Sequence, residues 1–284
     1  MILVTGGSGQ LARALVEGAG ARPLRCVGRP AFNFDRPETL APLLDAAAPA
    51  LVINAAAYTG VDQAEREPDA AMRANRDGPA SLARWCARAG VPLIHISTDY
   101  VFDGRKGAPY VEQDATCPTG VYGASKLAGE EAVLASGARA VILRTAWVYA
   151  PVGKNFVLTM LNAAQRTARL RVVADQRGCP TAAADLAAAI LAIADQPFDR
   201  PGIYHAAGSG ETTWYGLACA VFEAAARHGR RRPQVAAIAT ADWPTPARRP
   251  PDSRLDCGRL EATFGVRLPP WEESVARTVA AIVQ

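Results

Sequence analysis

Short apolar runs alternate with longer segments of helical periodicity over the first 150 residues of this 284-residue chain. The apolar runs are typical of buried strands and cover residues 1–5, 24–27, 51–54, 92–97 and 140–144. The segments between them predict helices over residues 11–17, 37–47, 61–67, 70–89 and 125–135, the last beginning at or before residue 125. Strands that alternate with helices in this way predict an α/β fold with a doubly wound parallel sheet.

The pattern is less regular after residue 150. Helices are predicted over residues 155–167, 183–194, 213–228, 260–264 and 272–283, strands over 170–173 and 202–206, and an ordered loop over 230–251. We therefore expect a first domain over residues 1–150. We expect residues 151–284 to form mainly a smaller lobe, with segments near 175–206 that return to the first domain.

A glycine-rich turn lies between the first strand and the first helix. Gly6, Gly7 and Gly9 permit a tight turn and a close approach of the backbone to a pyrophosphate. The amide groups at the start of the helix then bind the phosphate oxygens. This order of strand, turn and helix is the context that a dinucleotide fingerprint requires, so the first domain is predicted to be a Rossmann domain.

The end of the second strand bears on which nicotinamide cofactor is bound. An acidic residue at this place selects NAD, but the strand ends at Val27, Gly28 and Arg29. Arg29 is suited to a 2′-phosphate, which favours NADPH over NADH, although a solvated arginine is the alternative. Asn33 and Phe34 follow shortly after and are candidates to border the adenine.

Tyr122 and Lys126 are separated by one helical turn and lie on one face of the predicted helix. A lysine ammonium near a tyrosine favours the phenolate and lowers the tyrosine pKa, which makes Tyr122 a candidate proton donor. Thr98 follows the strand over 92–97, at a sheet edge where ligands bind in such folds. Its hydroxyl is a candidate hydrogen-bond donor to a substrate carbonyl oxygen.

These motifs together resemble the extended short-chain dehydrogenase/reductase superfamily. Within it the chain is similar to the dTDP-4-dehydrorhamnose reductase family, and the similarity extends over almost the whole chain. It is carried by the stretches TGGSGQLARAL, VINAAAYTGVDQAE, ISTDYVFDG, YGASKLAGE, RTAWVYAPVGKNFV, DQRGCPT and RRPPDSRLD, and by the helix bearing Asn75.

The resemblance implies a role for each matching residue. Tyr122 would be the catalytic proton donor, Lys126 would lower its pKa and hold the nicotinamide ribose, and Thr98 would orient the keto oxygen. The residues implied in cofactor binding are Gly9, Gln10, Leu11, Ala57, Tyr58, Thr59 and Ile96, in addition to Gly6, Arg29, Asn33 and Phe34 above. Those implied in substrate binding are Thr98, Asp99, Trp147, Asn155 and Arg249, with Arg254 as a weaker candidate for the diphosphate.

The activity implied is NADPH-dependent reduction of the C4 keto group of dTDP-4-dehydro-L-rhamnose to dTDP-L-rhamnose, with NADH as a possible second donor. One alternative is a related nucleotide-sugar reductase, epimerase or dehydratase, but Tyr100 stands where dehydratases carry a glutamate. The other is a catalytically silent regulatory subunit, against which Thr98, Tyr122 and Lys126 argue. Trp214 and Trp243 are candidates either for a sugar pocket or for the core.

Composition and charge limit the partners. A net charge of +4 gives no case for nucleic acid, and no apolar run approaches the roughly 20 residues of a membrane span. The six scattered cysteines indicate a reduced, cytoplasmic protein and show no metal-type spacing. Some relatives bind magnesium at a dimer interface through a glutamate, for which this chain has Ala14. We therefore expect no metal, and a monomer or weak homodimer.

Overall fold

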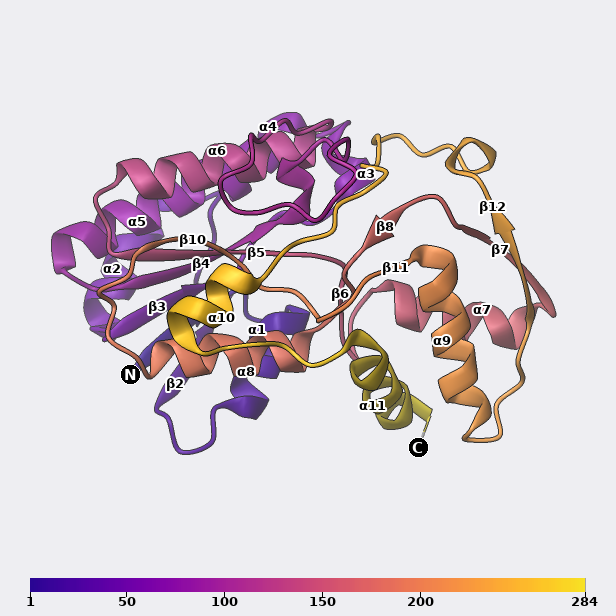
Figure 1. Ribbon diagram of the computed structural model, residues 1–284. Coiled ribbons are helices and arrows are strands. Elements are labelled where there is room, and N and C mark those ends of the chain that lie inside the picture. The colour runs from indigo at the N-terminus through magenta and orange to yellow at the C-terminus, as the bar shows by residue number, and fades with distance from the viewer. Residues whose placement is uncertain (284) are drawn as a thin grey trace.

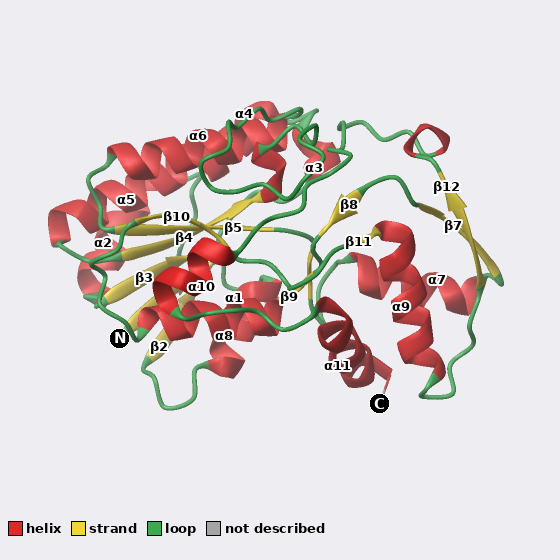
Figure 2. Ribbon diagram, viewed as in Figure 1, coloured by secondary structure: helices red, strands yellow, loops and turns green. Residues whose placement is uncertain are grey.

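The centre of the molecule is a parallel sheet (Figures 1 and 2), which has six strands. The computed structural model describes residues 1–283. In spatial order the strands are β10 (Gly202–His205), β5 (Ala140–Thr145), β4 (Leu93–Thr98), β3 (Leu51–Asn54), β1 (Ile2–Thr5) and β2 (Leu24–Val27). The strand order reverses between β1 and β3, so the predicted doubly wound sheet is confirmed.

Helices cover both faces of the sheet (Figure 1). One face carries α1 (Gln10–Gly18), α8 (Ala183–Ala194) and α10 (Gly258–Phe264), and the other carries α2 (Leu40–Ala47), α5 (Gly78–Ala89) and α6 (Val121–Ala135). Successive strand residues supply the two cores: Val4 packs with α1 and α8, whereas Leu3 packs with α2 and α5. Because the sheet is buried on both faces, its strands have continuous apolar sequences and not alternating ones.

A smaller lobe lies beside the carboxyl ends of the strands (Figure 1). Its core lies between α7 (Phe156–Arg166), α9 (Trp214–Ala226) and α11 (Trp271–Val283). The lobe also contains the paired two-residue strands β6 (Val148–Tyr149) with β9 (Thr181–Ala182), and β8 (Arg177–Gly178) with β11 (Thr212–Thr213). Within residues 1–283, no helix is both long and apolar enough to cross a membrane.

The predicted loop over residues 230–251 is wrong in part. It contains β12 (Gln234–Ile238), which pairs in parallel with β7 (Arg169–Val173), and the short 3₁₀ helix η4 (Thr240–Asp242). The sequence of β12 is QVAAI, in which two alanines and mostly exposed positions give no strand signal. Pairing with β7, which lies far away in the sequence, makes this segment a strand.

Several helices of the first domain also begin and end at residues other than those predicted. The expected helix over 61–67 is only the short α3 (Val61–Ala64), and 70–89 is divided into α4 (Pro68–Met72), a π-helical turn η2 (Arg73–Asp77) and α5. The helix α6 begins at Val121 because the carboxylate of Glu65 accepts a hydrogen bond from the Val121 amide at 2.8 Å. This tertiary cap places Tyr122 in the first turn of α6.

Candidate active site

The glycine turn after β1 leaves the start of α1 open. Gly6 has φ +99°, and a Cβ there would lie 2.8 Å from the carbonyl oxygen of Ala55. Gly9 precedes α1 and provides no side-chain cap, so the amides of the first turn have no side-chain acceptor there. Leu11 is buried in the core, which leaves only its backbone for a ligand. The turn therefore has the geometry of an anion-binding helix terminus.

Gly28 and Arg29 lie beside this turn at the end of β2. A Cβ at Gly28 would lie 2.8 Å from the Cα of Gly7, so an acidic residue does not fit here without a shift of the turn. Arg29 is exposed and forms an ion pair with Asp35 at 2.9 Å. The same carboxylate lies 3.4 Å from Nε of Arg73 in η2, which the sequence did not single out. Two guanidinium groups thus lie close together beyond the end of β2.

The two residues expected to border the adenine differ in position. The Asn33 side chain accepts a hydrogen bond from the Asp35 amide at 3.1 Å in an exposed turn. Phe34 is buried, packs edge-on against Phe32 with ring centroids 5.1 Å apart, and fills the space that a side chain at Gly78 would need. The ring of Phe34 belongs to the core between α2 and α5.

Asn75 joins the cofactor side of the site to the catalytic helix. Its Oδ1 accepts from the Tyr58 amide at 2.8 Å, and its Nδ2 donates to the Tyr58 carbonyl at 3.0 Å and to Oγ of Ser125 at 2.9 Å. Asn75 is fully buried in the π-helical turn η2, a type of distortion that is frequent at functional sites. Ala57 and Thr59, which flank Tyr58, are exposed beyond β3.

Tyr122 and Lys126 lie one turn apart on α6. Lys126 is buried, its Nζ donates to the carbonyl oxygen of Ile96 at 2.6 Å, and burial lowers its pKa to about 8 although the charge of Glu130 acts to raise it. Tyr122 is half-buried, and desolvation raises its pKa to about 12, which the neighbouring Thr98 hydroxyl offsets only in part. The expected lowering of the Tyr122 pKa is therefore wrong, because burial raises this pKa.

Thr98 and Asp99 form the polar end of β4. The Thr98 hydroxyl donates to Oδ1 of Asp99 at 3.0 Å and accepts from the Tyr100 amide at 3.2 Å. Asp99 is 2% exposed, and burial raises its pKa to about 6 although hydrogen bonds to its carboxylate oppose this. Among residues 1–283, the Oδ2 atom of Asp99 has no hydrogen-bond partner. Such an acceptor suits a polar substrate group.

Arg249 extends from the smaller lobe toward Tyr100 and Tyr122. Its guanidinium lies 6.0 Å from the centroid of the Tyr100 ring, which in turn packs edge-on against Tyr122 with centroids 5.7 Å apart. Asp62 in α3 holds Nη2 of Arg249 at 2.8 Å. The sequence had named Arg249 but neither Tyr100 nor Asp62 as a partner. Only the packing of the lobe on α3 and α6 brings these residues together.

Trp147 and Asn155, two further expected substrate residues, both contact other parts of the protein. Trp147 has φ +48°, and its ring stacks on that of Trp214 with ring centroids 3.5 Å apart. The two indoles therefore form one aromatic surface. Asn155 caps α7 by accepting from the Leu158 amide at 3.0 Å, and its Nδ2 donates to Oε1 of Gln10 at 2.7 Å. Its amide thus joins the lobe to the glycine turn.

Arg254, the weaker diphosphate candidate, is held by carboxylates. Its guanidinium binds Asp252 at 2.8 and 2.6 Å and also forms an ion pair with Glu211 at 2.5 Å. The side chain is 9% exposed, and these partners raise its pKa. The structure therefore places Arg254 in a structural ion-pair network, where two acidic groups already neutralise its charge.

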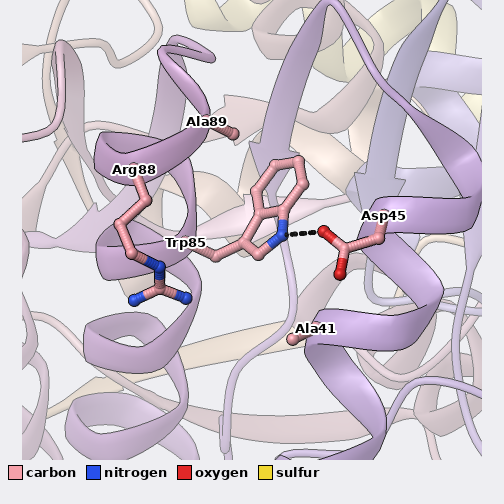
Figure 3. Close-up of a pocket in the computed structure, with 5 residues that line it drawn as sticks. All are labelled: Ala41, Asp45, Trp85, Arg88 and Ala89. Atoms are coloured by element: carbon pink, nitrogen blue, oxygen red, sulfur yellow. Dashed lines mark hydrogen bonds between the residues drawn. The ribbon is translucent and has the colours of Figure 1, made fainter.

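A cavity of about 280 Å³ lies between α2 and α5, away from all of these residues (Figure 3). Its walls are Ala41, Asp45, Trp85, Arg88 and Ala89. The Trp85 indole donates to Asp45 at 2.7 Å. The cavity lies against the helical layer and not at the carboxyl ends of the strands. It has no connection with the chemistry of the Tyr122 centre.

Comparison with known proteins agrees with this geometry. The family model "RmlD substrate binding domain" matches residues 1–284. The chain is similar to the dTDP-4-dehydrorhamnose reductase of Sinorhizobium fredii, with 48% identity over 99% of this chain and 97% of that protein. It is also similar to the Escherichia coli enzyme of the same name, with 42% identity over 86% and 84%.

Solved structures show the same relationship. A dTDP-4-dehydrorhamnose reductase from Clostridium acetobutylicum has a TM-score of 0.93 and 34% identity, over 100% of this chain and 99% of that one. The Bacillus anthracis enzyme, solved in complex with NADP, has a TM-score of 0.93 and 31% identity, with 99% and 98% covered. The chain belongs to the dTDP-4-dehydrorhamnose reductase family and is an oxidoreductase.

Proposed function

We propose that this enzyme reduces the C4 keto group of dTDP-4-dehydro-L-rhamnose with NADPH, and that Tyr122 donates the proton. The observation that carries the proposal is the convergence of Tyr122, Lys126 and Thr98 at the carboxyl end of β4, beside the open glycine turn. The names of the relatives support the substrate, and the NADP complex of the Bacillus anthracis relative supports the cofactor.

The residues of the glycine turn fit a dinucleotide. The uncapped start of α1 provides amide donors for a pyrophosphate, and the lack of a side chain at Gly6 keeps the turn tight against Ala55. Arg29 and Arg73 supply positive charge beyond β2 for a 2′-phosphate, in exchange for their contacts with Asp35. When bound, the nicotinamide would supply the hydride.

Three side chains of the protein would stabilise the negative charge that develops on the keto oxygen. The Tyr122 hydroxyl would donate its proton to that oxygen, and a raised pKa keeps this proton in place until charge develops. The Thr98 hydroxyl would turn from Asp99 to hydrogen-bond the same oxygen. Lys126 would stabilise the resulting tyrosinate, because its amine lies one turn away and is mostly protonated near neutral pH.

Replacement of Tyr122 by phenylalanine tests the proposal. Loss of a general acid typically costs about 10²–10⁴-fold in rate, so kcat should fall by at least about a hundredfold. Tyr204→Phe on β10 is the matched control, because the Tyr204 hydroxyl donates to the Arg200 carbonyl at 3.0 Å, before the start of that strand, and its loss should not affect kcat. Full kcat in the Tyr122→Phe enzyme would contradict the proposed proton donor.

The cofactor preference needs a separate test. Arg29→Ala should raise the KM for NADPH and leave that for NADH nearly unchanged, because only NADPH carries the 2′-phosphate. Arg232→Ala, which removes another exposed arginine in an ion pair far along the chain, is the control. Equal changes in both KM values would contradict a role for Arg29 in choosing the cofactor.

A further inference from the structure

A buried ion pair lies beneath the helix that carries Tyr122 and Lys126. Glu130 of α6 and Arg144 of β5 are 1% and 2% exposed, and the carboxylate accepts from Nε of Arg144 at 2.9 Å and from Nη2 at 2.7 Å. Within residues 1–283, Arg144 forms no ion pair with any other carboxylate. Neither side chain takes part in the proposed proton transfer, so the reaction at the keto oxygen does not explain the pair.

Stability alone is a weak reason for such a pair. The loss of hydration on burial largely offsets the attraction between the two charges, and apolar residues of similar volume are often at least as stable in their place. Apolar residues do not supply direction, however, whereas two parallel hydrogen bonds from a guanidinium to a carboxylate fix both a distance and an angle. The pair is therefore suited to hold α6 in one position on the sheet.

The contacts of Lys126 and Glu130 with the sheet lie side by side. The two residues are one helical turn apart on α6. Nζ of Lys126 donates to the carbonyl oxygen of Ile96 on β4 at 2.6 Å, whereas Glu130 binds Arg144 on β5. In the register of these strands Arg144 lies opposite Ser97, the residue after Ile96. Two contacts with neighbouring strands, one turn apart, restrain both the rotation and the translation of α6.

Arg144 is itself held in place. Its guanidinium lies 5.1 Å from the centroid of the Phe102 ring, which is fully buried and stacks on Tyr110 with ring centroids 4.1 Å apart. The amide of Phe102 donates to the carbonyl oxygen of Asp99 at 3.1 Å. Arg144 therefore connects α6 with the segment that follows the polar end of β4.

The charge of Glu130 also acts on Lys126. Burial lowers the Lys126 pKa to about 8, and the negative charge of Glu130 opposes this decrease. His95 of β4 is fully buried, and its pKa is held well below the ordinary value by burial and then by the charge of Lys126, so it adds no charge here. Glu130 thus helps to keep the amine of Lys126 protonated, the state in which it would stabilise a tyrosinate at Tyr122.

We propose that Glu130 and Arg144 are positioning residues for the reaction, and that their ion pair fixes α6 on the sheet so that Lys126 and Tyr122 face the keto group. The inference rests on the proposed function, because both residues act through Lys126 and Tyr122. Loss of the pair should therefore reduce the rate even where the protein remains stably folded.

The double variant Glu130→Met with Arg144→Met separates activity from stability. Its apolar side chains should fill the buried space and keep the protein folded in urea unfolding, but flexible methionines do not fix the helix in one position. The kcat for reduction of the ketosugar should fall by at least about tenfold, because a misplacement of about 1 Å can cost about a hundredfold in rate. The KM for NADPH should change far less, because the glycine turn leads into α1 on the opposite face of the sheet.

A second double variant, Arg22→Ala with Asp195→Ala, is the matched control. It removes an ion pair of 2.5 Å between partly exposed side chains beyond the ends of α1 and α8, and kcat should be unchanged. The single variant Arg144→Lys keeps both charges but cannot form two parallel hydrogen bonds with Glu130. Its kcat should lie between those of the wild type and the methionine variant.

A wild-type kcat in the folded methionine variant would overturn the proposal, because the pair would then be replaceable without loss of positioning. If that variant does not fold, a wild-type kcat in Arg144→Lys would overturn the proposal instead. Failure of the proposed function would look different. In that case the wild-type enzyme would not oxidise NADPH with the ketosugar, or Tyr122→Phe would retain full kcat.

Discussion

Removal of the Asn75 amide should destabilise the protein and weaken cofactor binding together. The isosteric variant Asn75→Leu deletes three hydrogen bonds, two with the Tyr58 backbone and one with Ser125. Each contributes a net of about 1 kcal/mol, and Asn75 is fully buried, so the free energy of unfolding should fall by about 3 kcal/mol. The Tyr58 segment would lose its link to α6 at the same time.

Urea unfolding of the wild type and the variant measures this loss, provided that the m value is unchanged. Asn162→Ala is the matched control, because it removes an exposed amide on α7 and should alter the unfolding free energy by no more than about 0.5 kcal/mol. The dissociation constant for NADPH, measured by titration, should rise for Asn75→Leu only. An unfolding free energy within about 0.5 kcal/mol of the wild type would refute the reasoning.

Three further predictions concern buried charge and the capping of α6. Burial raises the Asp99 pKa to about 6, so its contribution to stability is fully present below the unfolded pKa near 4 and is lost as the pH rises through 6. Urea unfolding should show the wild type losing about 2–3 kcal/mol relative to Asp99→Asn between pH 4 and pH 7, and parallel pH profiles would contradict this. Glu130→Ala leaves Arg144 buried without its 2.7 Å partner and should cost about 3–5 kcal/mol in unfolding free energy, whereas the double variant Glu130→Met with Arg144→Met should recover much of it. Glu65→Ala removes the carboxylate cap from α6 and should cost about 1 kcal/mol, and a thermal midpoint equal to that of the wild type would argue against the cap.

The sheet and its glycine turn could be predicted because local signals agree with the final structure. The strands β1, β3, β4 and β5 are apolar runs buried on both faces, and the helices between them have clear periodicity. β12 was missed because its five residues carry no strand signal and depend on pairing with β7, about sixty residues earlier. The start of α6 at Val121 likewise depends on Glu65, which no local pattern reveals.

Of the candidate site, the sequence alone could predict the reactive residues but not the residues that surround them. Tyr122, Lys126 and Thr98 follow from spacing and position at strand ends, but their electrostatics depend on burial, which reversed the expected direction of the Tyr122 pKa. The partners of Arg249 are Asp62 and Tyr100, which lie about 150 to 190 residues away in the sequence. The carboxylate partners of Arg254 are likewise brought to it by the fold, and no local pattern reveals them.

The most direct test of the account is the rate of NADPH oxidation with dTDP-4-dehydro-L-rhamnose, followed by absorbance for the wild type, Tyr122→Phe and Tyr204→Phe. The account predicts turnover by the wild type and Tyr204→Phe, with a loss of at least about a hundredfold in kcat for Tyr122→Phe. The NADPH affinity of all three proteins should be similar. Turnover by Tyr122→Phe at the wild-type rate would contradict the central claim that this tyrosine is the proton donor.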